Sequence, residues 1–237
     1  MMPTDFHSHI LPGIDDGSGS VEESIAMLRM EAEQGVEHVI ATPHFYPQYD
    51  RPKDFLEKRA AAECRLREEM ARHCGLPQVS MGAEVYFFHG ISESDALLQL
   101  TISEKKCIMI EMPPAPWTED MYRELEAIYT QRGFQPILAH VDRYIRPWHT
   151  HGILHRLQDM PVLVQANADF FLEKGTAAMA MRMLRKDQIH LLGSDCHNTS
   201  KRKPNLGAVI AKVRGKLGEG VLERIQEYEN RVLDILK

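Results

Sequence analysis

The chain has 237 residues, of which 43% are apolar and 26% are charged, and its formal net charge is −6. This length and composition fit a globular protein that is large enough to bury most of its apolar surface without disulfides. The negative charge gives no basic footprint for nucleic acid. No stretch reaches the roughly 18 apolar residues of a membrane helix, so we expect neither nucleic-acid binding nor membrane insertion.

The four cysteines are scattered, and no two of them form a Cys-x-x-Cys pair. Neither a zinc ribbon nor a disulfide framework is therefore indicated. The first residues lack a basic region followed by an apolar run, so they do not resemble a secretion signal. A reducing, cytoplasmic location is the simplest expectation. The unusual feature of the composition is the number of histidines, which is 12.

The first helix is predicted from Val21 to Gln34, where apolar residues recur at the helical period. Ser20 and Glu23 predict a capping box at its start. Gly35 suits its end. The sequence thus marks both boundaries of this helix.

Strands and helices alternate along the whole chain. Strands are predicted at residues 3–6, 38–41, 78–87, 107–113, 135–140, 161–167 and 188–195. Further helices are predicted at residues 53–73, 118–132, 150–159, 173–185, 205–217 and 219–236. About seven such alternations imply parallel strands with helical crossovers. They predict an α/β barrel or near-barrel slightly short of the usual eight units. Periodicity leaves an open doubly wound sheet as the alternative.

Histidines and acidic residues stand at or just past the end of six of these strands. They are His7 and His9, His44, Glu84, Glu111, His140, and Asp195 with His197. The carboxyl ends of parallel strands meet at one rim, so these side chains are expected to converge there. Alternate residues of a strand share a side, which directs both imidazoles of the His-x-His pair to one face.

Converging imidazoles and carboxylates form a nitrogen and oxygen site that suits Zn²⁺, Mn²⁺ or Fe²⁺. The number of candidate ligands exceeds what one ion needs. It implies at least two ions and favours three. Each motif has a plainer explanation when taken alone. Glu111 could be a salt-bridged core residue, and the segment Ser194 to Asn198 could be a turn. The repeated position at strand ends favours the metal site. We expect the other histidines, including those of His149–His155, to be surface or packing residues.

The segments DFHSHILPGIDDG, ATPHF, GAEVYF, IEMP, LAHVDRY and GSDCHN occur in this order along nearly the whole chain. They resemble the polymerase-and-histidinol-phosphatase (PHP) superfamily. Within it they resemble the bacterial tyrosine-protein phosphatases of capsule and exopolysaccharide operons, the CpsB/CapC-like family. The resemblance implies one PHP-type domain over residues 1–237, folded as a distorted seven-stranded (β/α)7 barrel. It also implies a site for three divalent metal ions, usually Mn²⁺.

The resemblance further implies how the ligands divide among three ions. His7, His9, Glu84 and Asp195 would bind the first ion. Glu84 would also bridge to the second ion, which Glu111 and His140 would complete. Asp16, His44 and His197 would bind the third ion.

Residues around these ligands take their expected roles from the same resemblance. Arg143 matches a position that contacts phosphate, and Arg202 matches a second such position less closely. Asp15 would support a ligand instead of binding an ion. Cys196, between two ligands, should point away from them if the segment is extended. The loop at residues 45–52 is the part least transferable from the family, and its aromatic residues could either flank a phenyl ring or pack on the barrel.

A charge count supports an anionic substrate. Asp16, Glu84, Glu111 and Asp195 bring four negative charges, and three divalent ions would bring six positive ones. The site would then carry about +2 on an acidic protein, provided that the ions are included in the account. Metal coordination can lower the pKa of water from about 15.7 to about 7, and a tyrosine phenolate leaves at a pKa near 10. No cysteine nucleophile is required.

The leading hypothesis is a metal-dependent phosphatase that removes phosphate from a tyrosine-phosphorylated protein, namely a bacterial tyrosine kinase of polysaccharide assembly. A small-molecule phosphatase of the same superfamily, such as one acting on histidinol phosphate, is the nearer alternative. A non-catalytic metal-binding module, which would bind metal without turnover, is the alternative from another class. An oligomer is compatible with the sequence.

Overall fold

The computed structural model describes residues 3–102, 106–145 and 151–235 of the chain. Strands and helices alternate along it. The strands are β1 (Thr4–Ser8), β2 (His38–Ala41), β3 (His44–Phe45), β4 (Gln78–Met81), β5 (Glu84–Tyr86), β6 (Cys107–Glu111), β7 (Gln135–Leu138), β8 (Leu163–Asn167) and β9 (Leu191–Gly193). The α-helices are α1 (Val21–Glu33), α2 (Pro52–Met70), α3 (Leu97–Leu100), α4 (Glu119–Thr130), α5 (Asp142–Ile145), α6 (His151–Gln158), α7 (Ala168–Leu172), α8 (Ala177–Arg185), α9 (Leu206–Leu217) and α10 (Glu219–Ile235), and η1 (Ile91–Glu93) is a 3₁₀ turn.

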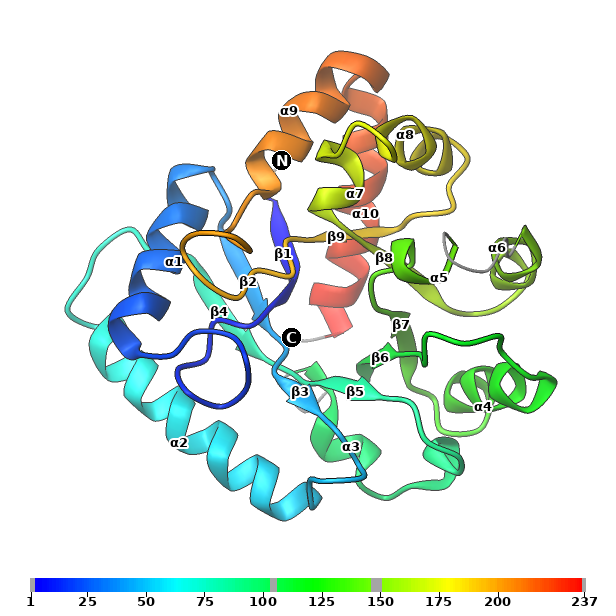
Figure 1. Ribbon diagram of the computed structural model, residues 1–237, viewed down its shortest axis with the longest axis horizontal. Helices are drawn as coiled ribbons and strands as arrows, with labels where there is room; N and C mark the ends of the chain where they lie inside the picture. The colour runs from blue at the N-terminus through cyan, green and yellow to red at the C-terminus, as the bar shows by residue number, and fades with distance from the viewer. Residues whose placement is uncertain (1–2, 103–105, 146–150, 236–237) are drawn as a thin grey trace.

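Every strand pair among the described residues is parallel, as the alternation of strands and helices predicts. The strands follow the orders β1-β2-β4 and β3-β5-β6-β7-β8-β9. Ser8 at the end of β1 makes a parallel bridge with Cys196 just beyond β9, so the first and last strands lie side by side. The sheet therefore curls, with helices around its outside (Figure 1). This curled α/β arrangement differs from the open doubly wound sheet that periodicity left as an alternative.

The described residues contain nine strand segments, because β3 follows the predicted strand 38–41 as an additional segment and the predicted strand 78–87 is divided in two, so the expected count of seven is not confirmed. The chain leaves β2 at Thr42 and Pro43 and resumes as β3. Proline has no N–H to give to a ladder, which accounts for this break. The predicted strand 78–87 is divided at Gly82, where an added Cβ would lie 3.1 Å from Ile102.

The helix prediction is correct for the long helices and incomplete for the short ones. The segment predicted as one helix at 173–185 contains the end of a loop and then α8. The short helices α3, α5 and α7 lie outside the predicted helices, because four or five residues are too few to display a helical period.

The cap of α1 differs in part from the predicted capping box. The Ser20 side chain accepts a hydrogen bond from the Glu23 backbone N–H at 3.2 Å, as expected. The Glu23 carboxylate accepts from the N–H of Gly19 at 3.0 Å, and not from that of Ser20. Both donors near the helix start are still satisfied.

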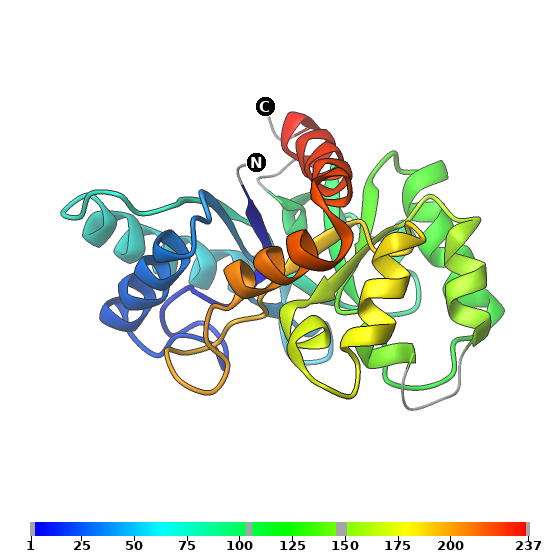
Figure 2. The ribbon, with the colours of Figure 1, turned by 90° about the horizontal axis from the view of Figure 1, so that it is seen from above.

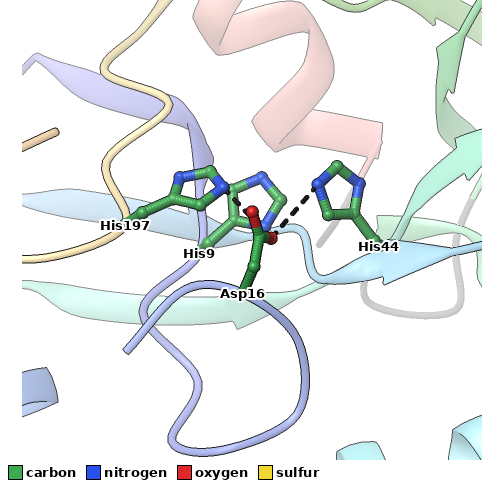
Figure 3. Close-up of side chains that lie close together, drawn as sticks. All are labelled: His9, Asp16, His44 and His197. Carbon is green, nitrogen blue, oxygen red and sulfur yellow. Dashed lines mark ion pairs between the residues drawn. The ribbon is translucent and has the colours of Figure 1, made fainter. Parts of the chain in front are cut away.

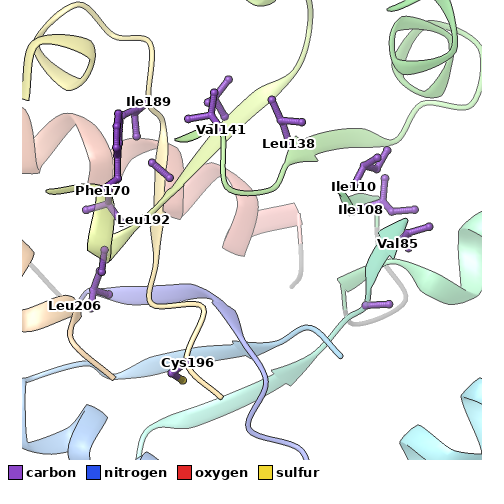
Figure 4. Close-up of a cluster of buried hydrophobic side chains, with 14 of the residues drawn as sticks. Val85, Ile108, Ile110, Leu138, Val141, Phe170, Ile189, Leu192, Cys196 and Leu206 are labelled. Atoms are coloured by element: carbon purple, nitrogen blue, oxygen red, sulfur yellow. The ribbon is translucent and has the colours of Figure 1, made fainter. Parts of the chain in front are cut away.

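Buried apolar side chains occupy both faces of the sheet. The larger cluster lies between the strands and the surrounding helices, and Figure 4 shows part of it, with Cys196 among its members. A smaller cluster, called the inner cluster below, lies on the other face. It consists of Phe6, Ile40, Ile102, Cys107, Met109, Ile137, Ala139, Leu191 and Val232. Two-sided burial accounts for the nearly continuous apolar run of β6.

The long helix α10 closes one end of the curled sheet. Its Val232 belongs to the inner cluster, and Tyr228 packs against it. Figure 2 shows α10 on the same side as the start of β1, with the loop that follows β9 on the opposite side. The loops after the strand ends are thus away from α10. No described helix is both long and apolar enough to cross a membrane.

A bulge in β1 turns His7 toward the inside of the curled sheet. Asp5 pairs with Val39 and Ser8 with Ala41, so β1 has one more residue than β2 between these pairs. Phe6 packs in the inner cluster. An extra residue reverses the alternation of a strand, and for this reason the residue after Phe6, His7, also faces inward.

The carboxyl group of Glu229 on α10 gives a prediction about the pH dependence of stability. Burial raises the pKa of Glu229 from 4.5 to about 8, although hydrogen bonds from the Thr4 backbone and from Gln226 oppose this. The folded state therefore holds this proton more tightly than the unfolded state does, and the contribution to stability is lost as the pH rises from about 4.5 to about 8.

We expect Glu229→Gln to stabilise the protein at pH 8.5 relative to wild type, and by less at pH 5, in urea unfolding. Each pKa unit is worth about 1.4 kcal/mol, so the difference should reach a few kcal/mol. Glu227→Gln, at an exposed position of the same helix, is the matched control. An identical effect of Glu229→Gln at both pH values would contradict this account.

Candidate metal centre

The nine side chains that the sequence suggested as metal ligands meet at the rim formed by the carboxyl ends of the strands. They are His7 and His9 at the end of β1, Asp16 in the next loop, His44 on β3, Glu84 on β5, Glu111 on β6, His140 after β7, and Asp195 and His197 after β9. All but Asp16 are buried or half-buried.

Glu84 lies at the middle of this cluster. Its Oε2 lies 3.1 Å from His7 Nε2, 3.3 Å from His9 Nε2 and 3.1 Å from His44 Nδ1, and its Oε1 lies 2.6 Å from His140 Nε2. Its burial opposes ionisation, but His7 and His140 hold the pKa of Glu84 well below its usual value. The group is therefore an ionised carboxylate with only 1% of its surface exposed.

Asp195 and Asp16 extend the cluster on the side of His9. Asp195 Oδ1 is 3.6 Å from His7 Nε2 and 3.4 Å from His9 Nε2. Asp16 Oδ1 lies 3.5 Å from His44 Nε2 and 3.4 Å from His197 Nε2, and Figure 3 shows this carboxylate between the two imidazoles.

The side chains group somewhat differently from the division that the family resemblance implies. Donor atoms of His9, Asp16, His44 and His197 lie within 4.8 Å of one another, and so do those of His7, His9 and Asp195 and those of His44, Glu84 and Glu111. His9 thus takes part in two groups, and His44 reaches Glu84 and Asp16 through its two different nitrogens.

Hydrogen bonds at Nδ1 orient three of the histidines. His9 Nδ1 is 2.7 Å from Asp15, His7 Nδ1 is 3.3 Å from Gln165, and His197 Nδ1 is 2.9 Å from the Asp195 carbonyl. An acceptor at Nδ1 keeps the proton there and leaves the Nε2 lone pair free for a cation. These Nε2 atoms all face the cluster.

Several buried polar atoms of the cluster lack a hydrogen bond. They are His44 Nδ1, Glu111 Oε2, His140 Nδ1, Asp195 Oδ1 and His197 Nε2. Buried polar atoms normally have a partner. Nitrogen and oxygen donors left without one fit divalent metal ions, which bind imidazole and carboxylate together.

Two of the nine residues have strained backbones. His140 has a φ of 31° and Asp195 a φ of 54°, both in the region that favours glycine. Such conformations cost on the order of 1–3 kcal/mol and persist where the surrounding structure enforces them. Gln165 accepts a hydrogen bond from the His140 backbone N–H at 2.6 Å, which helps to hold that bend.

The loop after β1 is closed tightly enough to fix Asp15 and Asp16. The Ser18 N–H donates to the His9 carbonyl at 2.9 Å. Gly17 is required in this turn, since an added Cβ would lie 2.2 Å from the same carbonyl oxygen. Asp15 also accepts from the His44 backbone N–H at 3.0 Å, and it supports His9, the kind of role that the resemblance suggests.

Strand β8 supplies supporting residues that the sequence interpretation missed. Besides contacting His7, Gln165 donates to Asn167 at 3.1 Å, and Asn167 Nδ2 donates to Asp195 at 2.8 Å. The sequence does contain a signal for these two residues, because Gln165 and Asn167 are polar residues two positions apart at the end of an otherwise apolar predicted strand.

Asp5 is the other missed residue, and it joins β1 to the segment after β9. Its Oδ1 accepts from the backbone N–H groups of His7 at 3.0 Å and Ser194 at 2.9 Å. Close approach of the two strands also needs Gly193, where an added Cβ would lie 2.6 Å from His7 Cβ.

The two arginines suggested as phosphate contacts reach the same carboxylate. Arg143 Nη2 lies 2.6 Å and Arg202 Nη2 2.9 Å from Asp195 Oδ2. Arg143 also contacts Glu111 at 3.3 Å. Their side chains remain 40% and 38% exposed, so each guanidinium stands at the mouth of the cluster.

Cys196, His38 and His155, which the sequence interpretation placed outside the site, lie elsewhere in the described part of the chain. Cys196 is fully buried and groups with Asp5 and Glu31, away from the histidines. Of the other histidines, His38 contacts Ser80 at 2.8 Å and His155 is largely exposed. His149 is outside the described residues.

The curled parallel α/β sheet and the histidine–carboxylate cluster on its rim define the class of the protein as an α/β protein with a candidate multinuclear metal centre. The family model described as "Capsular polysaccharide synthesis, CpsB/CapC" matches residues 3–234, and the chain belongs to this family.

Individual relatives agree with the family. The chain is 27% identical to the tyrosine-protein phosphatase YwqE of Bacillus subtilis over 208 residues, which cover 84% of this chain and 78% of the relative. It is 27% identical to the tyrosine-protein phosphatase CpsB of Streptococcus pneumoniae over 229 residues, 90% of each chain. A solved structure from work on YwqE and CpsB, described as metal-dependent tyrosine phosphatases, matches with a TM-score of 0.80 and 24% identity over 94% of this chain and 91% of the other.

The position of Gln165 predicts an effect on metal affinity. Gln165→Leu removes the acceptor for both His7 Nδ1 and the His140 N–H, so those imidazoles should lose their orientation. We expect the affinity for Mn²⁺ to fall roughly 10- to 100-fold, measured by isothermal titration calorimetry. Gln158→Leu at an exposed position should leave it unchanged. A folded Gln165→Leu protein with wild-type affinity would show that the contact does not orient the site.

Proposed function

We propose that the chain is a metal-dependent protein-tyrosine phosphatase that hydrolyses phosphotyrosine on a protein. The observation that carries the proposal is the convergence of the imidazoles and carboxylates around Glu84 in a chain of the CpsB/CapC family. Relatives of this family are named tyrosine-protein phosphatases. The nitrogen and oxygen donor set and the arginines at its mouth suit a phosphate ester.

Three divalent ions, with Mn²⁺ as the first choice and Zn²⁺ or Fe²⁺ as alternatives, are part of the proposal. His7, His9 and Asp195 would hold one. Glu84 would bridge to a second ion that Glu111 and His140 complete, and Asp16, His44 and His197 would hold the third. The orphaned buried atoms of this cluster support the assignment. When bound, such ions would activate water near neutral pH and stabilise the developing negative charge.

Arg143 and Arg202 would bind and orient the phosphoryl group. A planar guanidinium can donate two parallel hydrogen bonds to phosphate oxygens. Both side chains are partly exposed and lie beside Asp195, within reach of a phosphate at the cluster.

The chain offers no cysteine nucleophile at this site. Cys196 is the cysteine nearest the cluster in sequence, and its side chain is fully buried. Burial raises the pKa of the Cys196 thiol well above its usual value, so little of the reactive thiolate forms. Hydrolysis by activated water is the mechanism consistent with these residues.

The finer parts of the sequence interpretation belong to the same proposal. The nine strand segments would correspond to seven barrel positions if β2 and β3, and β4 and β5, each count as one interrupted strand. The chain would form one PHP-type domain. Its substrate would be a bacterial tyrosine kinase that regulates capsule or exopolysaccharide synthesis, and its location cytoplasmic.

Metal removal tests the proposal. We expect thorough chelation to abolish hydrolysis of p-nitrophenyl phosphate, because the rim without ions carries four carboxylates that repel the substrate, and added Mn²⁺ should restore it. His140→Ala, which removes a side chain in contact with Glu84, should lower kcat at least 100-fold. Undiminished activity in a chelated sample free of metal by elemental analysis would refute the metal mechanism.

Substrate comparison separates the proposal from its nearer alternative. The Mn²⁺-loaded protein should hydrolyse a phosphotyrosyl peptide at least tenfold more efficiently than histidinol phosphate, compared as kcat/KM. The reverse order would favour a small-molecule phosphatase. Tight Mn²⁺ binding without turnover of either substrate would favour a non-catalytic metal-binding module.

A further inference from the structure

A hollow of about 230 Å³ opens beside the candidate metal centre. Asp16 and His44, both candidate ligands, form part of its wall, so the hollow borders the cluster at these two residues. Its remaining wall consists of Ile14, Asp15, Tyr46, Asp50, Phe55 and Lys58. An apolar cavity of about 150 Å³ can hold a benzene molecule, and this hollow is therefore large enough for a phenyl ring.

Tyr46 is the aromatic side chain of the loop that is held in this wall. Its ring stacks on His44 with centroids 5.0 Å apart and contacts Tyr86 at 5.7 Å. Its backbone N–H donates to the Asp50 carboxylate at 3.0 Å, while the Asp50 N–H donates to the Tyr46 carbonyl at 2.8 Å. The turn and the ring contacts fix the side chain before any ligand arrives, which reduces the cost of binding.

The other two aromatic residues of this loop have different environments. Phe45 is 2% exposed and packs edge-on against Phe55 with centroids 5.3 Å apart, so it belongs to the core. Tyr49 is 89% exposed. The aromatic residues of this loop therefore differ in role. The Phe45 ring packs on the barrel, whereas the Tyr46 ring lies beside the cluster.

We propose that this hollow is the aryl subsite and that Tyr46 is a specificity-determining residue whose ring packs against the phenyl ring of phosphotyrosine. The inference rests on the proposed function and adds to it the place of the leaving group. A phosphate at the cluster next to Asp16 and His44 would have its ester oxygen within a short reach of the hollow. Ile14 provides apolar contact there, and Tyr46 provides an aromatic one.

The aryl leaving group of an aryl phosphate fits this wall better than the alkyl leaving group of an alkyl phosphate does. Aromatic pairs gain energy beyond the area that they bury, provided that the rings are offset or edge-on. A short polar alcohol would leave the Ile14 and Tyr46 side chains of this wall in contact with water. The subsite would therefore favour aryl over alkyl esters through binding of the leaving group, without altering the contacts to phosphate.

The test is a steady-state comparison of Tyr46→Ala, Tyr46→Phe and Tyr49→Ala with wild type, all loaded with Mn²⁺. The substrate is a phosphotyrosyl peptide, and inorganic phosphate is the competitive inhibitor. Tyr46→Ala should raise KM roughly 3- to 10-fold, whereas the Ki of inorganic phosphate stays within about twofold of wild type. Tyr46→Phe retains the ring and should keep the wild-type KM, as should Tyr49→Ala at the exposed control position.

The readouts separate the possible failures. An unchanged KM in Tyr46→Ala would overturn the subsite. A parallel rise of KM and of the Ki for phosphate would also overturn it, because Tyr46 would then act through His44 on the metal centre. A wild-type protein that binds Mn²⁺ but hydrolyses no phosphotyrosyl peptide would overturn the proposed function itself, whereas active variants with an unaltered KM overturn the aryl subsite alone.

Discussion

The carboxylate of Glu84 contacts four imidazoles while almost none of its surface reaches water. An unpaired charge in such a place would be very costly. The folded chain therefore has to bring His7, His9, His44 and His140 to it from strands that are far apart in the sequence. The curl of the sheet achieves this, because it turns the ends of parallel strands toward a common point.

Around this contact, a layer of ordinary hydrogen bonds decides which atoms face the centre. Asp15 and Gln165 accept from Nδ1 atoms, and Asn167 holds Asp195. These residues bind no proposed ion themselves. They hold the imidazoles in one orientation and ring tautomer, and such outer contacts influence metal affinity strongly. The positive φ angles of His140 and Asp195 indicate that the surrounding structure imposes this geometry.

Under the proposed function, two parts of the rim would recognise different parts of the substrate. The cluster and the two arginines offer charge and directional hydrogen bonds, which suit a phosphate. The adjacent hollow at Tyr46 offers aromatic and apolar contact instead. An aryl phosphate ester has both kinds of surface, and phosphotyrosine is such an ester. Separate regions for the two halves of a substrate allow specificity to change without loss of the chemical centre.

The sequence by itself determined the alternation of strands and helices, the parallel sheet and the identity of the residues on its rim. These follow from local periodicity and from the position of polar residues at strand ends, both of which are visible in a single chain. It did not predict the divided strands, since a break at Gly82 depends on the approach of Ile102.

Only the tertiary structure decided which residues support the centre and which aromatic residue stands beside it. Gln165 acts on His7 from 158 positions away, and Asp5 on Ser194 from 189. The bulge that turns His7 inward is likewise a matter of pairing between β1 and β2. Contacts between distant positions have no local pattern, because they arise only when the chain folds and the strand ends meet.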